Sequence, residues 1–201
     1  IGTDTGGSTR IPTAFTSITG FKPTQDSISR EGVLTLSSSL DSVGLMSKNV
    51  ELCKLSYYVM REKINVKQET TENKNLKFII PSNFGFENID TEIKVAFDFA
   101  KKKITESGYN VIEMNVPVLD LYKKVPIWQF ASVECATEYF YLYEKKKHLI
   151  DPNVLRRIER AREVTAVEYN LLKKIRENLI EEFNDFLKNN FLLMPTVTIK
   201  P

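Results

Sequence analysis

The segment from Gly2 to Arg10, GTDTGGSTR, combines glycines and hydroxyl side chains in a way that suits acyl transfer. Thr5, Gly6, Gly7 and Ser8 supply four consecutive backbone N–H groups, and glycines let the chain turn so that such groups converge. Converging N–H groups beside a serine hydroxyl are the arrangement of an oxyanion hole, which stabilises the intermediate formed when the hydroxyl attacks a carbonyl carbon. We therefore expect Ser8 to be a nucleophile.

Two other motifs fail on residue identity. A phosphate-binding P-loop requires a lysine before the hydroxyl residue, but Gly7 precedes Ser8. A nucleophile elbow, Gly-x-Ser-x-Gly, requires a glycine where Arg10 stands. Asp4 and Arg10 flank the glycines, and we interpret them as an ion pair that supports the loop.

A general base for Ser8 is not evident from the chain. A Ser-His-Asp triad requires a histidine, and the sequence contains one, His148. It follows three lysines at a predicted helix end, where a surface role is typical. A lysine is the next candidate, because a buried lysine can lose its proton near neutral pH.

These residues lie within a longer pattern that resembles the amidase signature family. An Asp-Thr-Gly-Gly-Ser-x-Arg core at 4–10, Gly-Phe-Lys-Pro-Thr at 20–24 and Ser-Leu-Asp-x-Val-Gly at 39–44 follow one another in the family's order. The match is dense over about residues 1–52. Beyond it, LLMPT at 192–196 resembles the family's late Pro-Thr strand.

The resemblance implies hydrolysis of a carboxamide by a Ser–cis-Ser–Lys triad, with no metal ion and no organic cofactor. By position, Ser8 would be the acylated nucleophile. Thr5, Gly6 and Gly7, together with the N–H of Ser8, would form the oxyanion hole.

The lysine base and the bridging cis serine precede the nucleophile in this family, and neither is in this sequence. Lys22, Lys48 and Lys54 follow Ser8, so the family's order excludes them from the role. We therefore expect residues 1–201 to be one partial amidase domain that lacks its upstream part and its C-terminal end. We also expect this part to be inactive alone.

Within the family, the sequence favours an amidase that acts alone on linear carboxamides. The A subunit of the glutamyl-tRNA(Gln)/aspartyl-tRNA(Asn) amidotransferase, a glutaminase, carries a Tyr-Asp-Gly-x-Arg-Tyr-Gly segment, and this chain has ASVECATEYFYLYEKKKHLI at 131–150 instead. That subunit remains the alternative, and a non-catalytic scaffold with the same fold is a third. Trp128 and Phe130 are candidates for the wall of a substrate pocket, although positions in the core explain them equally well.

The balance of charges limits the classes of partner that we expect for the chain. Its 28 basic and 26 acidic residues leave a formal net charge of +2, which gives no electrostatic case for nucleic acid or acidic membranes. No apolar run approaches the ~20 residues that cross a bilayer. The expected partners are a small amide substrate and a second copy in a homodimer, or the amidotransferase subunits under the alternative. Cys53 and Cys135 do not make a disulfide framework, so a cytoplasmic location is expected.

The elements around the motif predict an α/β fold. A buried-type strand at 76–82, a helix that Asp90 is expected to cap, and a strand at 109–117 form a βαβ unit. Because such units pair their strands in parallel, we expect a mixed, largely parallel central sheet covered by helices, the incomplete amidase signature fold.

The remaining elements are assigned by pattern. Asn49 is expected to cap a helix with Leu52, Leu55 and Val59 at helical spacing. Other expected elements are a short helix near residue 12, strands at 20–23, 43–46 and 191–196, helices at about 126–147 and 166–188, and an exposed linker at 65–75.

Overall fold

The structure is a computed structural model that describes residues 1–61, 75–188 and 190–201. By their contacts, the described residues of 1–66 and 126–173 form one compact unit, and those of 67–125 and 174–201 form a second. The predicted linker at 65–75 lies, apart from Asn75, outside the described residues. That residues 1–201 form one partial domain stays a prediction.

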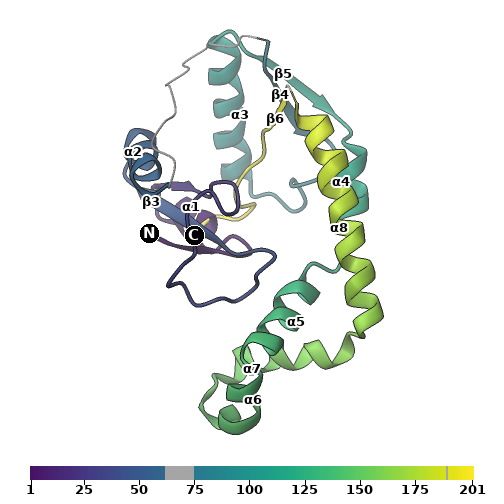
Figure 1. The fold of residues 1–201 in the computed structure, drawn as a ribbon. Coiled ribbons are helices and arrows are strands. Elements are labelled where there is room, and N and C mark those ends of the chain that lie inside the picture. Colours follow the sequence, from purple (N-terminus) through teal and green to yellow (C-terminus); the bar gives the residue numbers. More distant parts are fainter. Residues whose placement is uncertain (62–74, 189) are drawn as a thin grey trace. The chain divides into compact units, whose positions relative to one another are not determined.

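The first unit contains an antiparallel sheet of three strands (Figure 1). Strand β3 (Ser42–Ser47) lies between β1 (Gly2–Asp4) and β2 (Thr19–Phe21), and it pairs antiparallel with both. Its first four residues are buried because it is the central strand. The helix α1 (Arg10–Phe15) follows β1 and contacts β2.

Helix α2 (Val50–Met60) packs against β3 (Figure 1). The predicted cap is confirmed, because the side chain of Asn49 accepts the N–H of Leu52 at 3.0 Å. The stripe that carries Leu55 and Val59 is exposed, and the buried contact is made by Cys53 instead. The apolar core beneath α2 consists of Ile28, Val43, Leu45 and Cys53, with Val33, Tyr57 and Met60 packed against it.

Short helices form the rest of the first unit. They are α5 (Trp128–Glu138), α6 (Phe140–Lys146), α7 (Pro152–Glu159) and the 3-10 turns η1 (Lys147–Leu149) and η2 (Arg160–Glu163). The prediction of one continuous helix from 126 to about 147 is wrong, because the chain breaks at Tyr139, where φ is −104° and ψ is 25°. Neither glycine nor proline marks this break in the sequence.

The second unit contains a parallel sheet of three strands (Figure 1). Strand β4 (Lys77–Pro81) lies between β5 (Asn110–Met114) and β6 (Asn190–Leu192), and it is parallel to both. The helix α3 (Thr91–Glu106) connects β4 to β5, which confirms the predicted βαβ unit. The α/β class with a parallel sheet is confirmed as well.

Two further helices contribute to the core of the second unit. They are α4 (Pro117–Tyr122) and the last part of α8 (Ala166–Leu187), a helix whose first part belongs to the first unit. The core consists of Ile79, Val116, Val118 and Leu119, with Phe84, Ile112, Leu179, Phe183, Phe186 and Leu192 packed against it. Among the described residues, none of the helices has the length and apolar character of a transmembrane span.

Candidate active site

The predicted nucleophile lies in the turn between β1 and α1. Asp4 is the last residue of β1, opposite Ser42 of β3, and α1 begins at Arg10. Residues 5–9 therefore have to reverse the chain within a short distance. Ser8 is exposed in this turn, whereas Gly7 and Thr9 on either side of it are buried. The turn thus presents one serine hydroxyl between two anchored neighbours.

The carboxylate of Asp4, which is completely buried, organises the turn. Its Oδ1 accepts the N–H of Gly7 at 2.8 Å, and its Oδ2 accepts the N–H groups of Thr9 and Arg10, each at 3.3 Å. The guanidinium of Arg10 donates to both oxygens, from Nη2 at 2.8 Å and from Nε at 2.9 Å. Asp4 and Arg10 therefore form a two-pronged ion pair, the strong geometry for arginine and a carboxylate.

The ionisation of Asp4 reflects these contacts. Burial alone would raise its pKa. The hydrogen bonds from Arg10 and Gly7, together with the positive charge of Arg10, outweigh burial and bring the pKa of Asp4 below its ordinary value. Asp4 is therefore a carboxylate at neutral pH, and it draws the N–H groups of the turn toward itself.

Gly7 has a backbone conformation that other residues rarely adopt. Its φ is +115°, and a Cβ at this position would lie 2.6 Å from Cδ1 of Ile11. Because its N–H is donated to Asp4, Gly7 holds the turn in shape, and its N–H is not free to meet an oxyanion in this structure. The N–H groups of Thr5, Gly6 and Ser8 have no hydrogen-bond acceptor within the described part of the chain.

A second carboxylate, Asp41, supports the same turn from the Ser-Leu-Asp-x-Val-Gly segment. It is 4% exposed, and its Oδ1 accepts the hydroxyl of Thr5 at 2.5 Å. Its Oδ2 accepts the N–H groups of Leu36 at 2.8 Å and of Ser37 at 2.9 Å. Asp41 thus connects the turn to the loop at 36–41. The sequence alone did not predict this role, although an acid two positions after three serines was a signal.

A third carboxylate, Glu134 of α5, holds that loop from its other side. It accepts the hydroxyl of Ser37, the N–H of Ser39 at 3.0 Å and the hydroxyl of Ser39 at 2.5 Å. It also accepts the hydroxyl of Tyr169 of α8 at 2.6 Å. Nor did the sequence alone predict the role of Glu134. Its signal was a single acid in a stretch of small and apolar residues, ASVECA.

Lys22, the lysine of the Gly-Phe-Lys-Pro-Thr segment, lies beside the turn. Its Nζ donates to the carbonyl oxygen of Pro23 at 2.8 Å and to Oγ of Ser42 at 3.4 Å. Burial and the charge of Arg10 lower its pKa, although Asp4 acts in the opposite direction. Among the described contacts, Lys22 has none with Ser8.

Comparison with known proteins identifies the family to which this chain belongs. The family model for amidases matches residues 1–201. The chain belongs to the amidase family. A crystal structure of an amidase superposes on 99% of the chain with a TM-score of 0.85 and 26% identity, and the chain covers 45% of that protein. The resemblance to amidase signature enzymes is thereby confirmed.

Curated relatives of this amidase-family chain have more than one activity. The mitochondrial A subunit of the glutamyl-tRNA(Gln) amidotransferase of Candida albicans (strain WO-1) is 27% identical over 96% of the chain, which covers 51% of the relative. The 2-amino-5-chloromuconic acid deaminase of Comamonas testosteroni is 27% identical over 100% of the chain, which covers 44% of that enzyme. The chain thus spans about half the length of these relatives.

The two aromatic residues suggested for the substrate pocket have packed environments in this amidase-family chain. Phe130 is completely buried, and its ring meets that of Tyr169 edge to face, with the centroids 5.7 Å apart. The guanidinium of Arg160 lies over the ring of Trp128, 3.7 Å from its centroid. Such contacts are those of residues that stabilise helix packing. A contact with substrate stays a prediction for both residues.

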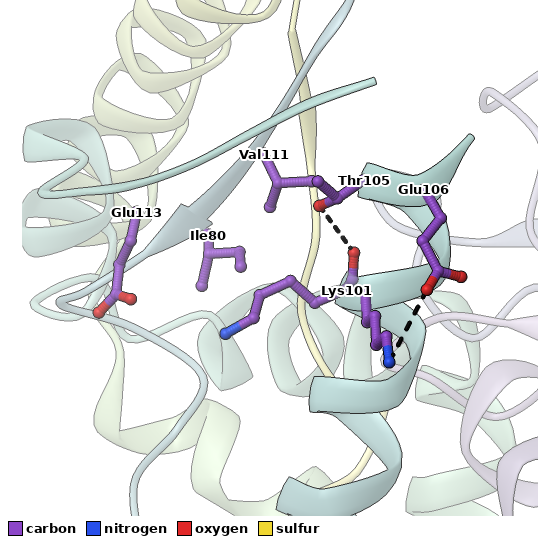
Figure 2. A pocket seen from close by; sticks show the side chains of 7 residues that line it. Ile80, Lys101, Thr105, Glu106, Val111 and Glu113 are labelled. Atoms are coloured by element: carbon purple, nitrogen blue, oxygen red, sulfur yellow. Dashed lines mark hydrogen bonds and ion pairs between the residues drawn. The ribbon is translucent and has the colours of Figure 1, made fainter. Parts of the chain in front are cut away.

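The second unit has a hollow of about 520 Å³ between α3 and the sheet (Figure 2). Its charged side chains on α3 have partners on the same helix: Lys101 pairs with Asp98 at 3.1 Å, and Lys102 lies 3.8 Å from Glu106. The hollow is lined by Ile80, Lys101, Lys102, Thr105, Glu106, Val111 and Glu113. None of the seven is a residue of the predicted site, so we assign the hollow no part in the chemistry.

Proposed function

We propose that the protein to which this chain belongs hydrolyses linear carboxamides through a covalent acyl-enzyme on Ser8. One observation carries the proposal. The turn fixed by Asp4 exposes the hydroxyl of Ser8 beside N–H groups of Thr5 and Gly6 that have no acceptor within the described residues. Acyl transfer requires a nucleophilic hydroxyl and nearby amide donors that can bind the oxyanion.

In this proposal, Oγ of Ser8 attacks the carbonyl carbon of the amide, and the carbonyl oxygen becomes negatively charged. The N–H groups of Thr5, Gly6 and Ser8 donate to that oxygen, and losing one such donor typically costs about 3 kcal/mol of transition-state stabilisation. Collapse of the intermediate breaks the C–N bond and releases the protonated amine. Water then hydrolyses the ester on Ser8 and regenerates the hydroxyl.

The proton of Ser8 needs an acceptor, and none contacts Ser8 among the residues that the structure describes. The family resemblance assigns it to a lysine that acts through a cis serine, both upstream of the nucleophile. Asp4 cannot serve, because its oxygens are occupied by Arg10 and by N–H groups of the turn. Under this assignment, residues 1–201 alone should be inactive.

A second candidate function is that of an amidotransferase A subunit, which would release ammonia from glutamine for partner subunits. The similarity to the Candida albicans A subunit over 96% of the chain favours it. We prefer the independent amidase because the segment at 131–150 lacks the Tyr-Asp-Gly-x-Arg-Tyr-Gly pattern of those subunits. Glutaminase activity that is stimulated by tRNA, together with copurifying subunits, would reverse this preference. A homodimer is the expected assembly of an independent amidase.

We also propose a cytoplasmic location. Cys53 and Cys135 are both buried and both reduced, and burial raises the pKa of Cys135 above its ordinary value. Buried cysteines without a disulfide are typical of proteins in a reducing compartment.

The experiment that tests the function uses the full-length protein. A fluorophosphonate probe should label Ser8, and Ser8→Ala should abolish both labelling and amide hydrolysis while the circular dichroism spectrum is unchanged. The matched control is Ser82→Ala, which removes another exposed serine hydroxyl and should leave both activities intact. Hydrolysis that survives in Ser8→Ala would end the assignment of the nucleophile. A folded full-length protein with neither activity would favour the non-catalytic scaffold.

A further inference from the structure

A continuous series of hydrogen bonds connects helix α5 to the turn that holds Ser8. Glu134 binds the hydroxyl of Ser37, Asp41 binds the N–H of the same serine, and Asp41 also binds the hydroxyl of Thr5. Ser37 is therefore shared by two carboxylates, and it is completely buried. Thr5 is the first of the residues whose N–H groups are proposed to meet the substrate oxygen.

The two carboxylates fix the loop at 36–41 from opposite sides. Asp41 holds the N–H groups of Leu36 and Ser37, and Glu134 holds the N–H and hydroxyl of Ser39. Hydrogen bonds to a charged acceptor are stronger than neutral ones and constrain geometry more tightly. If Glu134 were removed, the hydroxyl of Ser37 and the N–H and hydroxyl of Ser39 would lose the acceptor that Glu134 provides. The loop would then be free to shift, and Asp41 would move with it.

The charge of Glu134 is maintained by its partners. Burial alone would raise its pKa, but the hydroxyls of Ser37, Ser39 and Tyr169 and the N–H of Ser39 bring the pKa below its ordinary value. Glu134 is thus ionised at neutral pH although it is partly buried. A side chain needed only for helix packing would not require a charge with hydrogen-bond donors from two other segments.

We propose that Glu134 is a positioning residue for the reaction at Ser8, and that it acts through Ser37, Asp41 and Thr5 on the direction of the N–H groups in the turn. The inference rests on the proposed function, because it assigns Glu134 a role in the same reaction. Glu134 does not touch the reacting atoms. It binds Ser37 and Ser39 of the loop at 36–41, and Asp41 of that loop binds Thr5 of the turn.

The test compares Glu134→Gln with Glu138→Gln in the full-length protein. Glutamine keeps the shape of Glu134 but removes the charge and one acceptor. We expect kcat to fall roughly 10- to 100-fold with KM changed less than threefold, because a displacement of about 1 Å can cost on the order of 100-fold. The control changes an exposed glutamate of the same helix, one turn further on, and should leave kcat unchanged. Glu134→Asp, which keeps the charge, should recover part of the loss.

A double-mutant cycle tests whether Glu134 acts through Thr5. Thr5→Val removes the hydroxyl that Asp41 accepts and keeps the backbone N–H. If Glu134 acts through Thr5, the variant with both changes should be no slower than the slower single variant. If the rate losses of the two single variants multiply in the double variant, Glu134 and Thr5 act independently. That result would contradict an effect of Glu134 through Thr5.

The labelling of Ser8 by a fluorophosphonate separates the possible failures. If the wild-type protein neither reacts with the probe nor hydrolyses amides, the proposed function and this inference both fall. If the wild-type protein reacts and Glu134→Gln reacts equally fast, the inference alone falls. Should Glu134→Gln not fold, Ser39→Ala removes one donor to Glu134 and decides the question. We then expect labelling of Ser8 to be two- to fivefold slower, and an unchanged rate overturns the inference.

Discussion

Thr9 fills the space that a side chain on Gly44 would need. A Cβ built on Gly44 would lie 2.2 Å from Oγ1 of Thr9 and 2.7 Å from its Cβ. Thr9 is completely buried, and its hydroxyl donates to the carbonyl oxygen of Thr3 at 3.2 Å. The glycine of the Ser-Leu-Asp-x-Val-Gly segment therefore makes room for the residue that directly follows Ser8. Two motifs that are far apart in the sequence are complementary in shape.

Gly44→Ala should destabilise the protein by about 1–3 kcal/mol, the usual range for overpacking a buried site. The added methyl group would have to displace Thr9, whose N–H donates to Oδ2 of Asp4 and whose hydroxyl donates to the carbonyl oxygen of Thr3. Urea denaturation of the full-length protein measures the loss. The control is Gly2→Ala, whose methyl group would meet the flexible end of Met46 at 3.2 Å and would lie at an ordinary contact distance of 3.7 Å from Oγ1 of Thr9. Equal stability of the two variants would contradict the packing argument.

Gly7→Ala should slow the labelling of Ser8 and destabilise the protein by roughly 1–3 kcal/mol, because alanine is strained at a φ of +115°. The new methyl group would also approach Ile11 to 2.6 Å. Adding Ile11→Ala removes that clash but not the strain, so it should restore only part of the stability. Gly6→Ala is the comparison for stability, since a Cβ there meets nothing within 4 Å. Complete recovery in the variant with both changes would show that φ is not the limiting factor.

Asp4→Asn should cost about 1.5–3 kcal/mol, the usual range for hydrogen bonds to a charged group. It removes the charge that Arg10 and the N–H of Gly7 share. Asp26→Asn is the matched control, because the exposed pair of Asp26 and Arg30 belongs to the class of surface ion pairs that contribute about 0–1 kcal/mol. Thermal unfolding of the two variants side by side gives the comparison. A larger loss in the Asp26 variant would refute the special role of the buried pair.

The free energy of unfolding should depend on pH, and the pKa of Asp4 sets the direction of that dependence. Its pKa is lower in the folded protein than its ordinary value of 3.8, which applies to the unfolded chain. The stabilisation is therefore fully present above that value and is lost as the pH falls through the folded pKa. The free energy of unfolding should decrease from roughly pH 5 downward, and less steeply in Asp4→Asn. Glu134 acts in the same direction, so part of the slope should remain in this variant. Identical slopes would count against the assignment.

The residues of the turn were predictable because their meaning is local. The glycines, Ser8 and the flanking pair of Asp4 and Arg10 lie within nine positions, and a backbone bend requires the same residue types wherever it occurs. The parallel strands were predictable for a similar reason, since a βαβ unit follows from the order of short patterns. The spacing of Leu55 and Val59 correctly predicted a helix, but it could not tell which face of the helix is covered.

Asp41 and Glu134 were not predictable because their partners are distant in the sequence. Asp41 meets Thr5 across 36 positions, and Glu134 meets Ser37 across 97. A single sequence records the presence of these acids but not which loop each will face. The break at Tyr139 was hidden for another reason: residues on both sides favour a helix, and only the packing of Tyr143, Cys135 and Ile158 shows where the chain turns.

Helix caps also show the difference between local contacts and contacts with distant residues, and they provide a final test. Asn49 and Asp90 both precede helices, but only the side chain of Asn49 accepts an N–H of its own helix, whereas the side chain of Asp90 accepts the N–H of Lys200 at 3.0 Å. Asn49→Ala should therefore cost about 1 kcal/mol, the typical value of a lost cap. Amide hydrogen exchange should show the loss at the first turn of α2. Asp90→Ala should instead speed exchange at Lys200 and leave the first turn of α3 protected as before. Increased exchange at the start of α3 would show that Asp90 caps its helix after all.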